Sequence, residues 1–183
     1  MTSLAAFTVL VVLVGVERLA ELVVSKRNAA WSFARGGVET GFSHYPAMVV
    51  LHTGLLAGAL VEAYVRDPHV PSGLAWSMLA VVVLSQALRW WCIATLGHQW
   101  NTRVIVVPGL PLVDRGPYRW FTHPNYVAVV VEGFALPLVG SAWITATVFT
   151  ICNAVLLRVR ISVENEALHA IAGRAPGVDP VPT

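Results

Sequence analysis

Residues 126–157 read YVAVVVEGFALPLVGSAWITATVFTICNAVLL, an apolar stretch of 32 residues. A membrane-spanning helix needs about 20 such residues, so this stretch is too long for one span. Pro137 and the pair Gly140-Ser141 interrupt it, and residues of these types end helices and form turns. The sequence therefore predicts two helices joined as a hairpin, over residues 126–139 and 141–157.

Three more apolar stretches precede the hairpin, at about residues 4–24, 46–64 and 74–96. The whole chain is 56% hydrophobic and 12% charged, against about 45–50% and about 25% in soluble domains. Its net charge is only +2, without a dense basic tract, which argues against nucleic-acid binding. We therefore predict an all-α fold, an integral membrane bundle of five transmembrane helices forming one domain over residues 1–183.

The distribution of basic residues tests the predicted number of spans, because cytoplasmic connections of membrane proteins are rich in such residues. Five spans place nine basic residues on one side and only Arg66 on the other. The nine are Lys26, Arg27, Arg35, Arg103, Arg115, Arg119, Arg158, Arg160 and Arg174. We therefore expect the N-terminus outside, with the C-terminus and any active site in the cytoplasm. The first segment is expected to remain as a span, and a short C-terminal helix is predicted over residues 158–172.

Charged residues interrupt the first predicted span near its cytoplasmic end. Glu17, Arg18 and Glu21 lie there, with Arg18 and Glu21 three residues apart on one helical face. Charges within spans face protein or water, because lipid exposure costs several kcal/mol. Two interpretations stay open for these residues and for Glu132: a self-neutralising ion-pair cluster, with Arg89 as a further partner, or the polar wall of a substrate cavity.

Residues 25–45 carry more reactive groups than a simple connection needs. His44 is the candidate general base, because an imidazole titrates near neutral pH. The alternative is an ordinary hydrogen-bonding histidine. Cys92 and Cys152 lack the spacing of metal ligands, so neither a metal site nor a disulfide framework is predicted.

The richest motif region begins before the hairpin, with Gly116-Pro117-Tyr118 and His123-Pro124-Asn125-Tyr126. Pro124 suits the first turn of a helix, so His123 is expected at the cap. Arg160, Glu164 and Glu166 follow in the tail. Their carboxylates suit ribose hydroxyls or a cationic centre, and the guanidinium suits an anion. By residue chemistry alone, these groups predict a polar pocket at a membrane surface.

These motifs, together with Leu112-Val113, resemble the isoprenylcysteine carboxyl methyltransferase family of integral-membrane enzymes, which use S-adenosylmethionine. The resemblance implies a cofactor pocket at the cytoplasmic ends of the last helices, with Arg160 reaching the methyl acceptor. Asn165 stands where the family often has a second glutamate. The residues implied to line the cofactor are Leu112, Val113, Tyr118, His123, Pro124, Asn125, Tyr126 and Glu164.

The N-terminal half resembles a small bacterial branch of that family. The resemblance rests on Glu17-Arg18-x-x-Glu21, Ser25-Lys26-Arg27-Asn28, Gly36-Gly37-Val38-Glu39, His44-Tyr45 and Leu96-Gly97-x-x-Trp100-Asn101-Thr102. It implies a protein of the bacterial cytoplasmic membrane, linked functionally to a type III polyketide synthase. The implied substrate is a lipophilic alkylpyrone or alkylresorcinol.

The acceptor determines what the catalytic residues must do. A carboxylate is already ionised near neutral pH and needs only a positive group such as Arg160. A phenol, with a pKa of about 10 as in tyrosine, needs a base or a strong local field. We therefore expect His44, Glu17 and Glu21 to distinguish an enzyme for phenols from one for carboxylates.

Three hypotheses follow from the sequence. The first is an S-adenosylmethionine-dependent O-methyltransferase for a lipidic enol or phenol. The second is a carboxyl methyltransferase for a prenylated cysteine or another lipid acid. The third is a small transporter or lipid-binding membrane protein without enzymatic activity, whose buried charges form a path or a binding site.

Overall fold

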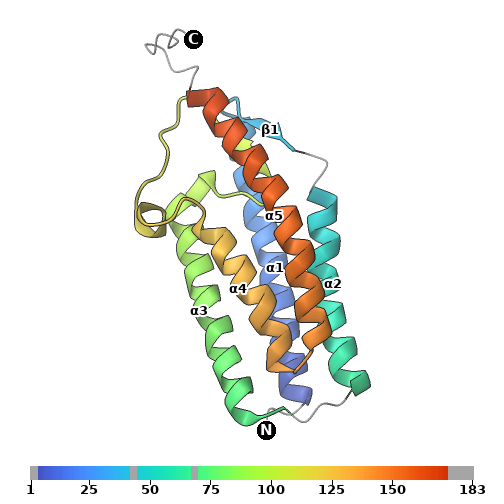
Figure 1. Cartoon of the computed structure of the whole chain (residues 1–183). Helices are drawn as coiled ribbons and strands as arrows, with labels where there is room; N and C mark the ends of the chain where they lie inside the picture. The colour runs from blue at the N-terminus through green and yellow to red at the C-terminus, as the bar shows by residue number, and fades with distance from the viewer. Residues whose placement is uncertain (1–3, 42–44, 67–69, 173–183) are drawn as a thin grey trace.

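The computed structural model describes residues 4–41, 45–66 and 70–172. Within these ranges the chain forms five α-helices that run along a common long axis (Figure 1). They are α1 (Leu4–Phe33), α2 (Tyr45–Arg66), α3 (Ser72–Leu96), α4 (Pro124–Val139) and α5 (Trp143–Ala172). The predicted helical bundle is confirmed, and the boundary at Gly140-Ser141 does separate α4 from α5.

The two ends of the bundle differ in the connections they carry (Figure 1). We call the end with the start of α1, the α2–α3 connection and the α4–α5 turn the hairpin end. We call the other end, with strand β1 and the C-terminal part of α5, the ribbon end. The α1–α2 and α3–α4 connections therefore lie at the same end, which is the alternation that the five-helix interpretation requires.

In the described part of the chain, three stretches are long and apolar enough to cross a membrane: Tyr45–Arg66, Ser72–Gln99 and Trp143–Leu168. The other two helices differ from them, because α1 carries charged residues in its middle and α4 has only 16 residues. Large apolar side chains face outward along the bundle; Val50 is 71% exposed and Leu84 is 69% exposed. Such a surface is suited to lipid, so these helices support an integral membrane protein.

The first helix is longer than the apolar stretch that predicts it. It continues past Val24 to Phe33 because polar side chains of this extension are buried against the connection that follows α3. The side chain amide of Asn28 donates to the carbonyls of Gly97 (3.1 Å) and Trp100 (2.8 Å). The expected loop after residue 24 is therefore helical up to Phe33.

The expected short C-terminal helix is wrong as a separate element. Helix α5 is continuous over 30 residues, from Trp143 to Ala172, because no proline or glycine interrupts that range. The all-α assignment also needs a small correction. Strands β1 (Val38–Thr40) and β2 (Val104–Val106) pair antiparallel at the ribbon end.

Interior packing is apolar and close near the hairpin end. Phe7, Val11 and Val14 of α1 meet small and branched residues of the other helices. A Cβ atom on Gly133 would come within 2.0 Å of the Phe149 ring, and one on Gly140 within 2.6 Å of the Phe7 ring. Small residues thus let α4 approach its neighbours closely, as is common between membrane helices.

Glu62 of α2 also holds the hairpin end together. Its carboxylate accepts hydrogen bonds from the backbone N–H groups of Ile144 (3.0 Å) and Thr145 (2.8 Å) at the start of α5. Arg66 pairs with it at 3.1 Å. A negative charge at a helix N-terminus satisfies free N–H groups and the helix dipole, so Glu62 has a structural role.

Candidate functional site

A cavity of about 250 Å³ lies inside the bundle between α1, α2, α4 and α5. Apolar side chains from these four helices form much of its wall, including Leu22, Leu56, Val129 and Leu156. Charged and polar residues form the rest: Arg18, Glu21, His52, Thr53, Arg89, Asn101, Thr102, Asn125, Tyr126, Glu132, Asn153 and Arg160. The cavity therefore combines an apolar compartment with a polar compartment.

A buried ion-pair cluster forms one wall of the cavity. Glu21 is 2% exposed and Arg89 is 7% exposed. Glu21 accepts from Arg89 Nη2 at 2.7 Å and also from Arg89 Nε. Arg18 Nη1 donates to Glu21 at 2.9 Å, and Arg18 Nη2 donates to Glu132 at 3.1 Å. The predicted pairing of Arg18, Glu21 and Arg89 is present in the structure, and it joins α1, α3 and α4 beside the cavity.

Glu17 lies on the edge of this cluster and outside the cavity lining. It accepts hydrogen bonds from the side chains of Gln86 and Trp90 on α3. Arg18 is 3.6 Å away from it. The structure thus places Glu21 on the cavity wall and directs Glu17 toward α3. Catalytic roles for both residues stay a prediction.

The motif residues at the start of α4 meet the last part of α5. The Tyr126 hydroxyl donates to Glu164, and Arg160 Nε donates to the Tyr126 oxygen at 2.8 Å. The ring of His123 stacks on Tyr126 at 5.3 Å between centroids, and its Nε2 lies 3.2 Å from Asn165 Oδ1. We call these residues (His123, Tyr126, Arg160, Glu164 and Asn165) the motif cluster. Folding therefore assembles residues separated by more than 30 positions.

Arg160 connects the motif cluster to the cavity. It is 5% exposed and lines the cavity together with Tyr126. Its guanidinium lies 5.5 Å from the Tyr126 ring centroid, and Nη1 contacts the Met48 sulfur at 3.0 Å. A guanidinium held from two sides can orient an oxygen atom within the cavity.

The turn after α3 closes the ribbon end of the cavity. The Ser25 hydroxyl lies 2.8 Å from the Thr102 hydroxyl and accepts from the Thr102 backbone N–H at 3.0 Å. Together with the Asn28 bonds, these contacts hold Trp100, Asn101 and Thr102 against the cavity. The polar extension of α1 therefore positions part of the site wall.

Other predicted cofactor residues lie on the connection that leads to α4. Leu112 is 70% exposed, and Val113 is partly exposed. Tyr118 belongs to the short helix η3 (Gly116–Arg119), which packs against α3. Burial raises the pKa of Tyr118, so its hydroxyl stays protonated at neutral pH. Tyr118 lies within electrostatic reach of Glu164 and Tyr126 of the motif cluster. Leu112 and Val113 precede it along the chain.

The predicted residues His123, Pro124 and Asn125 lie at the start of α4. Pro124 is buried in its first turn and His123 is its cap residue, as expected, without a capping bond from the side chain. Asn125 lines the cavity. His44, the candidate base, lies outside the described residues.

Several cavity residues were not singled out from the sequence. Asn153 of α5 is 2% exposed and lines the cavity; an asparagine within an apolar span was the available signal. Met48 also lines it, but a methionine does not stand out in an apolar sequence. Trp100 lines it too; the sequence identifies it only as part of the Leu96–Thr102 motif, without a role in a site. His52 also lines the cavity, with Nδ1 at 2.8 Å from the Met48 carbonyl.

Polar atoms without partners gather at this cavity. Six buried side-chain polar atoms have no hydrogen-bond partner within the described ranges. Five of them belong to residues that line the cavity: Arg18 Nε, Arg89 Nη1, Trp100 Nε1, Asn101 Nδ2 and Asn125 Oδ1. A buried polar group without a partner is costly, so their concentration indicates a place where a ligand supplies hydrogen bonds. Among the described residues, no group of three or more His, Cys, Asp or Glu side chains is arranged to hold a metal ion.

Comparisons with known proteins agree with this arrangement. The sequence profile of the isoprenylcysteine carboxyl methyltransferase (ICMT) family matches residues 78–170, from α3 to the last part of α5. The uncharacterized protein YpbQ of Bacillus subtilis (strain 168) is 39% identical over 164 residues, covering 89% of this chain and 96% of that protein. No solved structure matches significantly. The chain therefore belongs to the isoprenylcysteine carboxyl methyltransferase family, a family of membrane methyltransferases.

Proposed function

We propose that this protein is an S-adenosylmethionine-dependent O-methyltransferase for a lipidic enol or phenol, such as an alkylpyrone or alkylresorcinol. The observation that carries the proposal is the contact between the motif cluster and the cavity. Arg160 and Tyr126 belong to both, while Glu164 and His123 lie directly behind them. A polar binding region and a largely apolar cavity therefore share one wall.

The motif cluster and the neighbouring Asn125 fit the proposed cofactor in their chemistry. Asn125 Oδ1 is an acceptor without a partner in the described part of the chain, so it can accept a hydrogen bond from an amine or a hydroxyl group. The Glu164 carboxylate is a further acceptor, and the stacked rings of His123 and Tyr126 supply aromatic surface. The cofactor would supply an electrophilic methyl group here. We propose that it lies on the α4–α5 side of the cavity, with Tyr118, Leu112 and Val113 toward its approach.

The remaining chemistry falls to the chain itself. An acceptor oxygen must be aligned with the methyl group, and alignment alone can contribute about 7–11 kcal/mol to lowering a barrier. We assign that alignment to Arg160, because Tyr126 and Met48 fix its guanidinium beside the cavity. An enol or phenol must also lose its proton. Glu21, Glu17 and His44 stay the candidates for assisting that loss.

Carboxyl methylation of a prenylated cysteine or lipid acid is the second candidate. One observation favours it. A carboxylate acceptor needs no base, and the Arg160 guanidinium, which donates to the Tyr126 hydroxyl, can pair with a carboxylate in the cavity. The cluster of Arg18, Glu21, Arg89 and Glu132 favours the first candidate instead. These charges largely cancel, so they offer a polar wall without strong selection for an anion.

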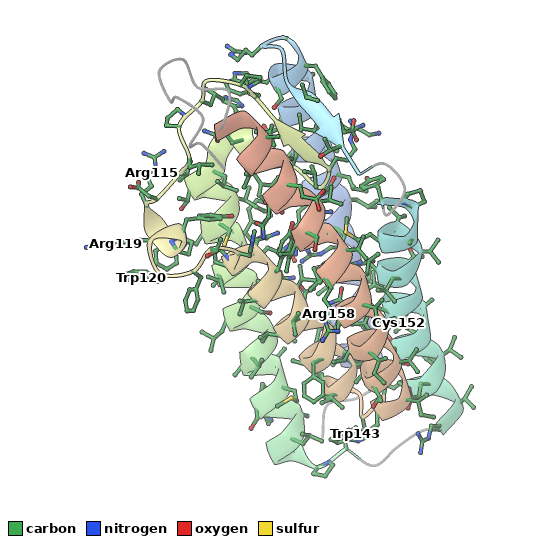
Figure 2. The ribbon with its side chains drawn as sticks, turned by 45° about the horizontal axis from the view of Figure 1, so that its top comes forward. Arg115, Arg119, Trp120, Trp143, Cys152 and Arg158 are labelled. Atoms are coloured by element: carbon green, nitrogen blue, oxygen red, sulfur yellow. The ribbon has the colours of Figure 1, made fainter. Side chains whose placement is uncertain are left out.

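We further propose that all five helices cross the membrane, with the ribbon end in the cytoplasm. The basic residues of both ribbon-end connections support this orientation. Aromatic residues that suit membrane interfaces lie toward both ends. Figure 2 shows Trp143 at the hairpin end, and Trp120 with Arg115 and Arg119 on the outer side of the connection to α4. The water-soluble cofactor would then approach from the cytoplasm.

Labelled methyl transfer in lipid nanodiscs tests the proposed function. The purified protein should transfer a methyl group from S-adenosylmethionine to an alkylresorcinol or alkylpyrone of matched chain length, more readily than to farnesyl-cysteine. Glu164→Ala and His123→Ala should lower the rate at least about 100-fold, since charged and orienting contacts of this kind act together. Ser162→Ala, at an exposed position of the same helix, serves as the control.

The competing hypotheses make different predictions in the same assay. Preferential methylation of farnesyl-cysteine would support the second candidate. Absence of cofactor binding by calorimetry, with lipid movement in proteoliposomes, would instead support a transporter or lipid-binding protein.

A further inference from the structure

The cavity reaches the outer surface of the bundle between α1 and α2. Leu19 of α1 and Val49 of α2 both line the cavity, yet they are 63% and 45% exposed. Thr53, one turn from Val49, lines it and is exposed as well. A residue can satisfy both conditions only where the cavity opens. We call these three residues the lateral mouth.

The surface around the lateral mouth is apolar. Val16, near Leu19 on α1, is 58% exposed, and Val50, next to Val49 on α2, is 71% exposed. On α1 the mouth lies in the middle of the helix, and on α2 it lies one to two turns after the first residue, Tyr45. In a membrane such a surface faces acyl chains, so the lateral mouth opens toward lipid.

The inner end of the cavity presents hydrogen-bond donors. Arg89 is 7% exposed and Trp100 is 2% exposed, and within the described ranges Arg89 Nη1 and Trp100 Nε1 have no partner. The same holds there for Arg18 Nε and Asn101 Nδ2. All four atoms are donors on residues that line the cavity. These donors favour a ligand whose buried part carries oxygen atoms that accept hydrogen bonds.

Charge narrows the class of ligand. Glu21 and Glu132 already pair with Arg18 and Arg89, so the donors are present without a large positive excess. A cationic head group would bring no acceptor to these donors. An uncharged or weakly acidic head group with two or more oxygen atoms meets them without burying an unpaired charge.

We propose that a single-chain amphiphile enters through the lateral mouth and places an oxygen-bearing head group against Arg18, Arg89, Trp100 and Asn101. The cavity volume of about 250 Å³ is below the roughly 300–1,000 Å³ of sites that enclose a whole ligand. The head group is therefore enclosed, and the rest of the aliphatic chain lies along Leu19 and Val49 in the bilayer. The identification of this ligand with the methyl acceptor rests on the proposed function.

Photo-crosslinking without cofactor tests this site. The full-length protein in nanodiscs is labelled with two dodecyl probes that carry a diazirine near the end of the chain, one with a resorcinol head and one with a trimethylammonium head. The resorcinol probe should label peptides containing residues 14–22 and 48–56, and unlabelled dodecylresorcinol should compete. Equal labelling by the ammonium probe, or labelling that does not saturate, would overturn the proposal.

Two matched pairs of variants localise the effect. Leu19→Trp fills the mouth and should reduce competed labelling at least about tenfold, whereas Leu13→Trp, at a 60% exposed position of α1 outside the cavity lining, should leave it unchanged. Trp100→Phe removes one donor and keeps a ring, so the Kd of dodecylresorcinol should rise about tenfold. Trp76→Phe, at a 63% exposed position, is its control. Unchanged labelling in Leu19→Trp would contradict entry of the amphiphile through the lateral mouth.

Methyl transfer measured on the same preparations separates the two proposals. Specific labelling through the mouth without any methyl transfer would sustain the binding site and refute the proposed function. Methyl transfer that is indifferent to Leu19→Trp, with labelling elsewhere on the bundle, would sustain the function and refute the lateral mouth.

Discussion

The same helices pack closely in one half of the bundle interior and separate around a cavity in the other half. Near the hairpin end, glycines and alanines bring helices into direct contact, as Gly133 does with Phe149 and Gly140 with Phe7. Near the ribbon end, the helices separate around a cavity, and arginines and glutamates join them across it. Close apolar packing therefore provides rigidity in one half, while paired charges hold open a compartment in the other.

This contrast explains where chemistry can occur. A close-packed interior of small residues leaves no room for a ligand. A compartment walled by paired charges supplies both space and hydrogen-bonding groups, although burying those charges is costly unless each pair stays intact. We therefore expect substitutions in the hairpin half to change stability, and substitutions at the cavity to change activity with smaller effects on stability. Substitutions in the charge cluster are the exception, because we expect them to lower both stability and activity.

Glu21→Gln should have the largest effect on stability, because the charge cluster depends on it. Glu21 pairs with both Arg18 and Arg89, and removing one partner of a buried pair costs about 3–5 kcal/mol. Equilibrium unfolding in mixed micelles should show this loss in the free energy of unfolding, and activity should fall with it. A loss below about 1 kcal/mol would mean that water, and not pairing, stabilises the two arginines.

Glu62→Gln makes a matched comparison, since it removes the same charge at the hairpin end. Glu62 faces backbone N–H groups and the half-exposed Arg66. A glutamine oxygen can still accept from one of those groups, so the expected cost is about 1 kcal/mol. Activity should stay near that of the unaltered protein.

Gly133→Val tests the close-packed half directly. The new side chain would overlap the Phe149 ring, and overpacking of this kind costs about 1–3 kcal/mol. The free energy of unfolding should fall by that amount, and Phe149→Leu should restore part of it in the double variant. If Gly133→Val removes methyl transfer without changing stability, the division between a structural half and a functional half is wrong.

Much of the fold could be predicted because apolar stretches of spanning length and helix-breaking residues are local signals. The break at Gly140-Ser141 and the five helices follow from such signals. The extension of α1 to Phe33 could not, because its buried Ser25 and Asn28 are held by the turn after α3, a contact between distant parts of the chain. The three-residue strands β1 and β2 are too short to show a pattern.

The candidate site, like the fold, could be predicted only in part from the sequence. The spacing of Arg18 and Glu21 predicts their pairing, and the family motifs identify His123, Tyr126, Arg160 and Glu164 as a group, which the structure brings together. Sequence reasoning could not show that Trp100 and Asn153 face one cavity, because their placement depends on how four helices pack. Nor could it show that Leu112 would be 70% exposed.

Tyr126→Phe should have a small effect on stability and the most selective effect on function. The change removes one hydroxyl, which donates to Glu164 and accepts from Arg160. Loss of such a bond is worth about 1 kcal/mol, and a guanidinium that is no longer fixed should slow methyl transfer by about tenfold, mainly in kcat, because orientation counts most in the transition state.

The same chemical change at the other end supplies the control that sharpens the comparison. The Tyr64 hydroxyl lies 3.2 Å from the Thr8 hydroxyl near the hairpin end, where Tyr64 is 56% exposed. Tyr64→Phe removes an equivalent hydroxyl far from the cavity, so methyl transfer should be unchanged and the melting temperature should shift by at most a few degrees. Equal rate losses in the two variants would show that activity depends on the rigidity of the whole bundle. A loss confined to Tyr126→Phe would assign it to the position of Arg160.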